Sequence, residues 1–223
     1  MSFIINAYKK AIIHRWDEES YIKYFSYQDF PNLNHEEYEI LYKDYKLKGA
    51  LYFYPNAKKD KLIIFVHGFG AGHRSYFREI EMMCKKGYRV FAYDNLGCAD
   101  SEGEDIISLT EIIPTLLTII DFVNKNFSFL DLILVGHSWG GFAVGCAPNY
   151  YQNISKIVCV SPFISVKTAI FGFLHQKGIV AHKIINYEHK HFPQYGYSSV
   201  ENAIKNTNTE FLFIHSKDDP TVS

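Results

Sequence analysis

The sequence predicts an α/β fold, in which a mostly parallel sheet carries helices on both faces. From residue 61 onward, short apolar runs alternate with segments of helical spacing, which is typical of parallel strands joined by crossover helices. The apolar run at 132–135 leads directly into a glycine-rich turn and then into a segment of small residues. The chain has 223 residues, 48% of them apolar, so it is large enough for one domain with a full core.

The first segment, residues 1–36, is expected to form a helix and a connector ahead of the core. Residues 3–16 place apolar side chains near helical spacing, with Lys9, Lys10 and Arg15 on the opposite side. We predict that this helix docks on the domain. A membrane-surface helix is the alternative, and only those three basic residues favour it. Residues 17–36 are polar and aromatic and are interpreted as the connector.

The α/β core is expected to occupy residues 37–223. Its first part, residues 37–54, alternates polar and apolar side chains and predicts an antiparallel hairpin with strands at 37–45 and 46–54. Continuous apolar runs then predict buried parallel strands. The elements expected after the hairpin are strand 62–66, helix 74–86, strand 88–93, helix 106–124 with Pro114 near its first turns, strand 132–135, strand 155–160 and strand 210–215.

The stretch between the last two expected strands does not fit this alternation. Residues 163–205 are too many for one crossover helix and include the aromatic residues Phe163, Phe171 and Phe173. They follow the carboxyl end of a strand, where ligands bind in open α/β sheets. We therefore predict a small inserted cap over the active site. An ordinary crossover with a longer loop is the alternative.

The turn after strand 132–135 reads Gly136-His137-Ser138-Trp139-Gly140, which matches the pattern G-x-S-x-G. Strand, sharp turn and helix in this order predict a nucleophile elbow, in which Ser138 has a strained backbone and its hydroxyl stands clear of the sheet. Side chains at 136 and 140 would clash with the neighbouring strand and helix, which explains the glycines. A chance glycine-rich turn is the other interpretation.

Four segments together resemble the α/β-hydrolase fold family, and within it the esterase, monoacylglycerol-lipase and serine-aminopeptidase-like branch. They are G-H-S-W-G-G from residue 136, H-G-F-G-A-G from residue 67, D-N-L-G-C-A-D-S-E-G from residue 94 and H-S-K-D-D-P-T-V from residue 215. The resemblance covers about residues 37–223.

The resemblance implies a serine hydrolase that needs no cofactor and no metal. It assigns the nucleophile to Ser138 and the catalytic acid to Asp219, because Val222 lies three residues further on in the pattern D-x-x-V; Asp218 is the alternative acid. The remaining implied site residues are the oxyanion-hole amides of Phe69 and Trp139 and the motif glycines Gly68, Gly136 and Gly140.

The general base departs from the family pattern. The resemblance places it on a histidine after the acid, beyond one more strand and helix, but no histidine follows Asp219 in this sequence. We therefore expect a truncated form that lacks the last strand, the last helix and the base. Two earlier histidines, His67 and His137, lie in motifs where the family uses them structurally. The other candidates are His215, before the acid, and His175, His182, His189 and His191 in the expected cap.

The expected reaction is two-step acyl transfer at Ser138, and the aromatic cap favours a carboxylic ester with an apolar acyl group. An amide or N-terminal peptide substrate is the first alternative. The second is a hydrolase-like protein that binds a small ligand without turnover. The absent base favours that alternative, and the intact Ser138 and Asp219 argue against it.

Composition argues against other classes of function. A net charge of -1 gives no electrostatic basis for binding nucleic acid or an anionic membrane. The four cysteines form no metal-like spacing, and we expect free thiols in a soluble, cytoplasmic protein without stable membrane insertion. A metal-dependent enzyme would rest on His182, His189 and His191, but the H-K-H spacing at 189–191 lacks the carboxylate or cysteine partners of a metal site. The segment H-G-F-G-A-G lacks the ending of a phosphate-binding loop. The oligomeric state stays open.

Overall fold

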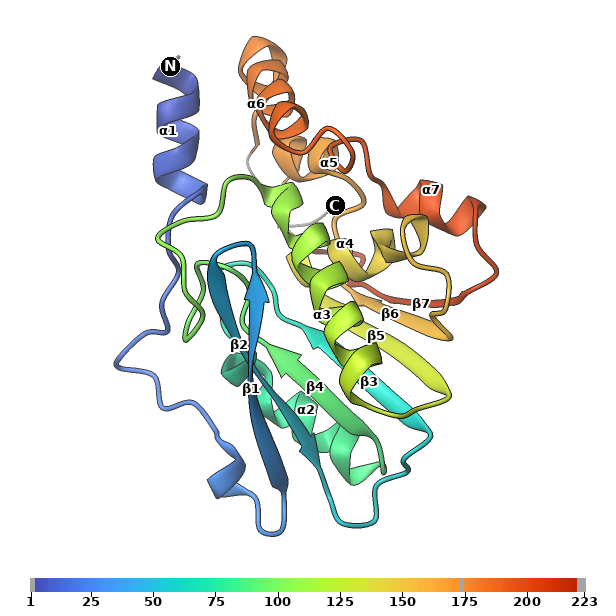
Figure 1. The fold of residues 1–223 in the computed structure, drawn as a ribbon. Helices are drawn as coiled ribbons and strands as arrows, with labels where there is room; N and C mark the ends of the chain where they lie inside the picture. Colours follow the sequence, from blue (N-terminus) through green and yellow to red (C-terminus); the bar gives the residue numbers. More distant parts are fainter. Residues whose placement is uncertain (1–2, 173–174, 220–223) are drawn as a thin grey trace.

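The fold is a twisted sheet with helices on both faces, as the sequence predicts (Figure 1). The structure is a computed structural model that describes residues 3–172 and 175–219. In these residues the sheet has seven strands in the order β1-β2-β4-β3-β5-β6-β7. Strands β1 and β2 are antiparallel to their neighbours, and the pairs from β4 to β7 are parallel. The strands are β1 Asn34–Tyr42, β2 Tyr45–Phe53, β3 Lys61–Val66, β4 Arg89–Tyr93, β5 Asp131–His137, β6 Lys156–Val160 and β7 Glu210–Ile214.

The sheet separates the core into two apolar clusters, one on each of its faces. Helix α2 packs on one face and α3 and α4 pack on the other, and α1 joins the second cluster through its contacts with α6 (Figure 1). Helices α5, α6 and α7 occupy the stretch between β6 and β7, where we expected a cap; that role stays a prediction. The α-helices are α1 Phe3–Ile12, α2 Phe77–Lys85, α3 Ile112–Asn126, α4 Trp139–Cys146, α5 Val166–Phe171, α6 Gly178–His191 and α7 Val200–Lys205. Short 3-10 helices are η1 Tyr27–Asp29, η2 His73–Tyr76, η3 Leu109–Glu111 and η4 Ala147–Asn149.

The N-terminal helix is shorter than the expected range 3–16. It ends at Ile12, because Arg15 and Trp16 leave the helix and bond to the loop after β4. Its buried face packs against α6, as the docking interpretation predicts. Within residues 3–172 and 175–219, no helix is both long and apolar enough to cross a membrane.

Further boundaries differ from the predictions. Strand β1 begins at Asn34, inside the expected connector, because residues 34–36 continue the antiparallel pairing with residues 51–53. The hairpin turns at Lys43 and Asp44, not between 45 and 46, because Lys43 adopts a φ of +53° and closes a two-residue loop. The helix expected at 74–86 begins with η2, since His73 is bonded to Asp94, and becomes α-helical at Phe77. The helix expected at 106–124 begins at Ile112, two residues before Pro114, because proline is tolerated only in the first turn.

A buried carboxyl joins three separate helices above the sheet. Glu188 on α6 is fully buried. The Tyr8 hydroxyl on α1 donates to its Oε1 at 2.7 Å, and the Thr110 backbone N–H on η3 donates to its Oε2 at 3.4 Å. Burial raises the pKa of Glu188 to about 7, although these donors oppose the shift. The protonated form is therefore favoured in the folded protein below neutral pH.

The stability of this contact should depend on pH. The folded-state pKa of Glu188 lies above its unfolded value near 4.5, so its contribution is complete below pH 4.5 and is lost as pH rises through about 7. Relative to Glu188→Gln, which stays uncharged, the parent should lose on the order of 3 kcal/mol of unfolding free energy across this window. Urea denaturation at several pH values measures the difference. The control is Glu201→Gln on α7, which removes only an exposed pair with Lys205. Parallel profiles for the parent and Glu188→Gln would contradict the prediction.

Candidate active site

Ser138 lies at the sharp turn between β5 and α4, at the carboxyl edge of the sheet. Its φ of +53° and ψ of −111° place a non-glycine residue in a strained region. The Ser138 N–H donates to the carbonyl of Val160 on the neighbouring strand at 2.8 Å, which fixes the turn. A Cβ on Gly136 would lie 2.3 Å from the Gly140 carbonyl oxygen, and one on Gly140 would lie 2.2 Å from the Val66 oxygen. Both glycines are therefore required by close backbone contact.

The loop after β3 is held by a buried histidine. The Nδ1 of His67 donates to the Gly68 carbonyl at 2.8 Å, and its Nε2 accepts the backbone N–H of Asn95 at 2.9 Å. These roles define the neutral tautomer, and burial lowers the pKa of His67 in agreement with it. The structural role expected for His67 is therefore observed, with both ring nitrogens occupied.

A tyrosine joins this loop to the turn. The Gly68 N–H donates to the Tyr76 hydroxyl at 3.1 Å, and that hydroxyl lies 2.8 Å from Nδ1 of His137. His137 is thus bonded to the side chain of Tyr76. Burial lowers the pKa of His137, and the negative charge of Asp219 acts in the opposite direction. Asp219 therefore lies within electrostatic range of the residue that precedes Ser138.

Asp219 follows β7 and is mostly buried, with 16% of its side chain exposed. Its Oδ2 lies 3.7 Å from Nε2 of His215. The neighbouring Asp218 is exposed, and its backbone N–H donates to the Ser216 hydroxyl at 3.3 Å. Val222, on which the D-x-x-V assignment rests, lies outside the described residues. Two observations favour Asp219 over Asp218 as the acid. The Asp219 side chain is mostly buried, and its negative charge acts on the pKa of His137.

The two residues expected to supply oxyanion-hole amides are in contact through their side chains. The Phe69 and Trp139 rings lie 5.4 Å apart in an edge-on arrangement. Trp139 is buried, and its Nε1–H donates to the Leu109 carbonyl at 2.7 Å. As the first residue of α4, it has a backbone N–H at a helix N-terminus, where such groups lack intrahelical partners. The loop after Gly68 and the start of α4 are therefore adjacent.

Comparison with known proteins identifies the family. Residues 57–218 match the family described as "Serine aminopeptidase, S33". The chain belongs to this S33 family. It is 24% identical to a monoglyceride lipase of Rattus norvegicus over 86% of this chain and 60% of the relative. Its identity with the human monoglyceride lipase is 28% over 62% of this chain and 44% of the relative. The chain thus spans 60% or less of the length of these relatives.

Solved structures show the same fold. A Pyrococcus furiosus esterase, Pf2001, superposes with a TM-score of 0.69 at 21% identity, over 93% of this chain and 80% of that one. Est1E from Butyrivibrio proteoclasticus, with ferulic acid bound, gives 0.69 at 20% identity over 83% and 80%. The fold of this S33 chain is therefore the α/β-hydrolase fold, as the motifs indicate.

Sequence reasoning missed a buried ion pair in this S33 chain. Nδ1 of His73 lies 2.8 Å from Oδ1 of Asp94, which also accepts the His73 backbone N–H at 2.7 Å. Burial alone would raise the pKa of Asp94, but His73 lowers it to about 2, and Asp94 in turn raises the pKa of His73 against the effect of burial. Nε2 of His73 lies 2.9 Å from the Tyr52 hydroxyl. Because both ring nitrogens are engaged, His73 is not available as a base for Ser138. Only Asp94, which directly follows β4, stood at a position that the sequence could indicate; His73 begins η2, beyond the loop after β3.

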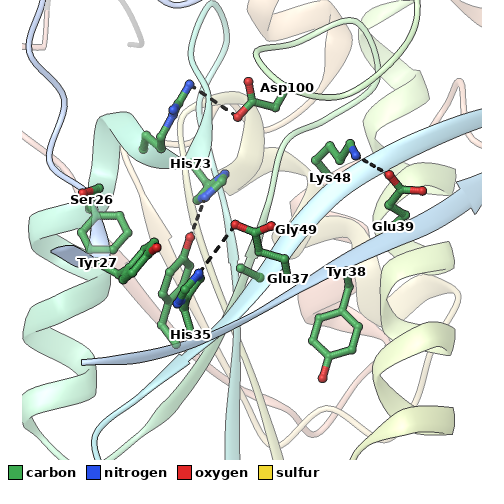
Figure 2. Close-up of a pocket in the computed structure, with 14 residues that line it drawn as sticks. Ser26, Tyr27, His35, Glu37, Tyr38, Glu39, Lys48, Gly49, His73 and Asp100 are labelled. Carbon is green, nitrogen blue, oxygen red and sulfur yellow. Dashed lines mark hydrogen bonds and ion pairs between the residues drawn. The ribbon is translucent and has the colours of Figure 1, made fainter. Parts of the chain in front are cut away.

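The ion pair lies beside a cavity of about 690 Å³ between the connector, the β1–β2 hairpin and α2 (Figure 2). The lining includes neither Ser138 nor Asp219. Its charged groups already pair with one another, as the dashed lines in Figure 2 show for His35 with Glu37 and for Lys48 with Glu39. We therefore do not place the active site of the S33 fold in this cavity.

Proposed function

We propose that the chain carries the nucleophile and acid of a serine hydrolase that cleaves a carboxylic ester through an acyl-enzyme at Ser138. The observation that carries the proposal is the backbone of Ser138, with a positive φ at the junction of a buried strand and a helix N-terminus. Strain of this kind persists where the surrounding structure fixes it and is concentrated at functional sites. The S33 family and the monoglyceride lipase relatives support the same reaction class.

In the proposed reaction, the Ser138 oxygen attacks the ester carbonyl while a histidine base removes the hydroxyl proton. The tetrahedral intermediate collapses, the alcohol leaves with that proton, and an acyl-enzyme remains. Water then repeats the two steps and releases the carboxylic acid. The backbone N–H groups of Phe69 and Trp139 stabilise the oxyanion in both halves of the reaction. Asp219 orients the base and stabilises its imidazolium form.

The identity of the base distinguishes two arrangements. His215 is 3.7 Å from Asp219 and follows β7, which is two strands from β5 and Ser138. Because adjacent strands are spaced about 4.8 Å apart, the backbones of His215 and Ser138 lie about 10 Å apart, a separation that their two side chains would have to span. In the first arrangement His215, beside Asp219, is the base. In the second, the base is the histidine that the family pattern places after the acid.

The cap region supports an apolar acyl group. Phe171 on α5 keeps 39% of its surface exposed and is available to line a substrate path. Phe163 is buried and stacks on Phe142 at 4.7 Å, so it belongs to the core. Phe173 lies outside the described residues. Two of the three histidines considered for a metal have other partners. His189 packs on Tyr197, and Nδ1 of His191 bonds to the Tyr187 carbonyl.

Amide hydrolysis is the second candidate. The family is named for serine aminopeptidases, and a proline iminopeptidase of Saccharolobus solfataricus is 27% identical over 57% of this chain. A ligand-binding protein without turnover is the third.

The free, buried state of all four cysteines supports a reducing, cytoplasmic location, and the small negative charge argues against nucleic-acid partners.

A substrate panel separates these candidates. In the longest natural form that contains residues 1–223, we expect hydrolysis of monoacylglycerols and p-nitrophenyl esters, but little cleavage of prolyl p-nitroanilide. The ester kcat/KM should rise by up to about fourfold per added methylene, since each buried methylene contributes about 0.8 kcal/mol. Faster cleavage of the anilide than of the esters would favour the amide candidate. Binding of an ester without release of acid would favour the non-catalytic one.

A further inference from the structure

The segment that follows α1 is fixed onto the loop after β4. Trp16 forms a parallel bridge with Cys98, in which its N–H donates to Gly97 and its carbonyl accepts the Ala99 N–H, both at 2.9 Å. The guanidinium of Arg15 donates to the backbone carbonyls of the same loop, including Ser101 at 2.9 Å. These contacts hold the segment against the core independently of α1.

The indole of Trp16 lies on the loop that follows β3. Its ring is 5.0 Å from the Phe69 ring, in an edge-on arrangement, and Phe69 in turn contacts Trp139. The three atoms nearest to a Cβ built on Gly70 all belong to this indole, at 3.2 to 3.6 Å. The ring therefore covers the backbone directly after Phe69 and completes a row of three aromatic side chains that ends at Trp139, the residue after Ser138.

The backbone of this loop is most adaptable at Gly70. Gly68 is held by His67 and Tyr76, but Gly70, with a φ of +71°, has the conformational freedom of glycine. Oxyanion donors stabilise a transition state only when they are already in place, and a misplacement of about 1 Å can cost 10²-fold in rate. A rigid indole packed on Phe69 and Gly70 restricts this movement at the proposed donor.

We propose that Trp16 is a positioning residue for the oxyanion hole and that Arg15 and the Trp16 backbone hold it in place. The proposal rests on the function proposed for Ser138 and Phe69. It assigns a catalytic consequence to a segment that lies outside the matched family region of residues 57–218. Trp16 itself does not touch the reacting atoms in this proposal; it acts through the backbone of the loop after β3.

The kinetic test uses Trp16→Ala and Trp16→Phe in the longest natural form of the protein. Active sites are titrated at a temperature where each variant is folded. Trp16→Ala should lower kcat on p-nitrophenyl butyrate about 10- to 100-fold, with KM within about threefold, because donor placement acts on the transition state. Trp16→Phe should restore most of the rate. The matched control is Phe30→Ala. It removes a connector ring that stacks on Phe77 of α2 and should lower stability without lowering kcat. An unchanged kcat in Trp16→Ala, or a raised KM alone, overturns the proposal.

The second test does not depend on activity. Amide hydrogen exchange in residues 67–72 should become faster in Trp16→Ala and should stay at the parent rate in Phe30→Ala. Equal exchange in the parent and Trp16→Ala overturns the proposal even where kcat falls. If the parent hydrolyses no ester and Ser138 is unreactive, the proposed function fails. The exchange result alone then decides whether Trp16 orders the loop.

Discussion

Replacing Ser138 with alanine should lower kcat for ester hydrolysis by about 10⁶-fold, the scale of nucleophile loss in a serine protease. A fluorophosphonate probe should label Ser138 in the parent and leave Ser138→Ala unlabelled. The reason is that no acyl-enzyme forms without the hydroxyl, while the oxyanion donors and the substrate contacts stay in place. The fold should be preserved, because alanine carries no more than the strain that serine already bears at a φ of +53°. Steady-state kinetics and mass spectrometry of the labelled peptide measure both results.

Ser161 provides a matched control for this substitution. It follows β6, next to the strand that ends before Ser138, and also has a positive φ, of +43°. Its N–H donates to the Ile214 carbonyl at 2.8 Å, so its backbone geometry resembles that of Ser138. Ser161→Ala should keep its rate within about tenfold, because this hydroxyl has no role in acyl transfer. Probe labelling at Ser161, or undiminished turnover in Ser138→Ala, would disprove the assignment.

Replacing Asp219 with asparagine should lower kcat by about 10⁴-fold, as the corresponding loss does in a serine protease triad. The amide is nearly the same size as the carboxylate, but it does not stabilise the imidazolium and favours the wrong histidine tautomer. The substitution should leave fluorophosphonate labelling at Ser138 detectable but slower. Kinetics of ester hydrolysis at saturating substrate test this expectation, and thermal melting checks that the fold is kept.

Two further variants locate the acid and its partner. Asp218→Asn should cost less than about tenfold, because Asp218 is exposed. A larger loss there than in Asp219→Asn would move the acid by one residue.

His215→Gln separates the two arrangements of the base. If a histidine outside residues 1–223 removes the proton, His215→Gln should have a small effect. A loss as large as that of Asp219→Asn would assign the base to His215.

The parallel strands of this protein were predictable because their signal is local. Each is a continuous apolar run, and burial on both faces of a parallel sheet requires such a run whatever the neighbours are. The turn at Ser138 was predictable for a related reason, since the glycines that permit its close contacts lie within two residues of it. The helix expected at 3–16 was wrong only after residue 12. Periodicity does not show that Arg15 and Trp16 bond to a loop more than 80 residues away.

The sequence by itself determined the α/β class, the position of the strand–turn–helix unit and the family motifs, because each depends on residues close together in the chain. Only the tertiary structure decided which side chains meet. It joined His73 to Asp94, which withholds that histidine from Ser138. It buried Glu188 between three helices and placed Trp16 on the loop that carries Phe69. Such contacts depend on strand order and on where loops cross the sheet edge, and these follow from packing of the whole chain and not from any local pattern.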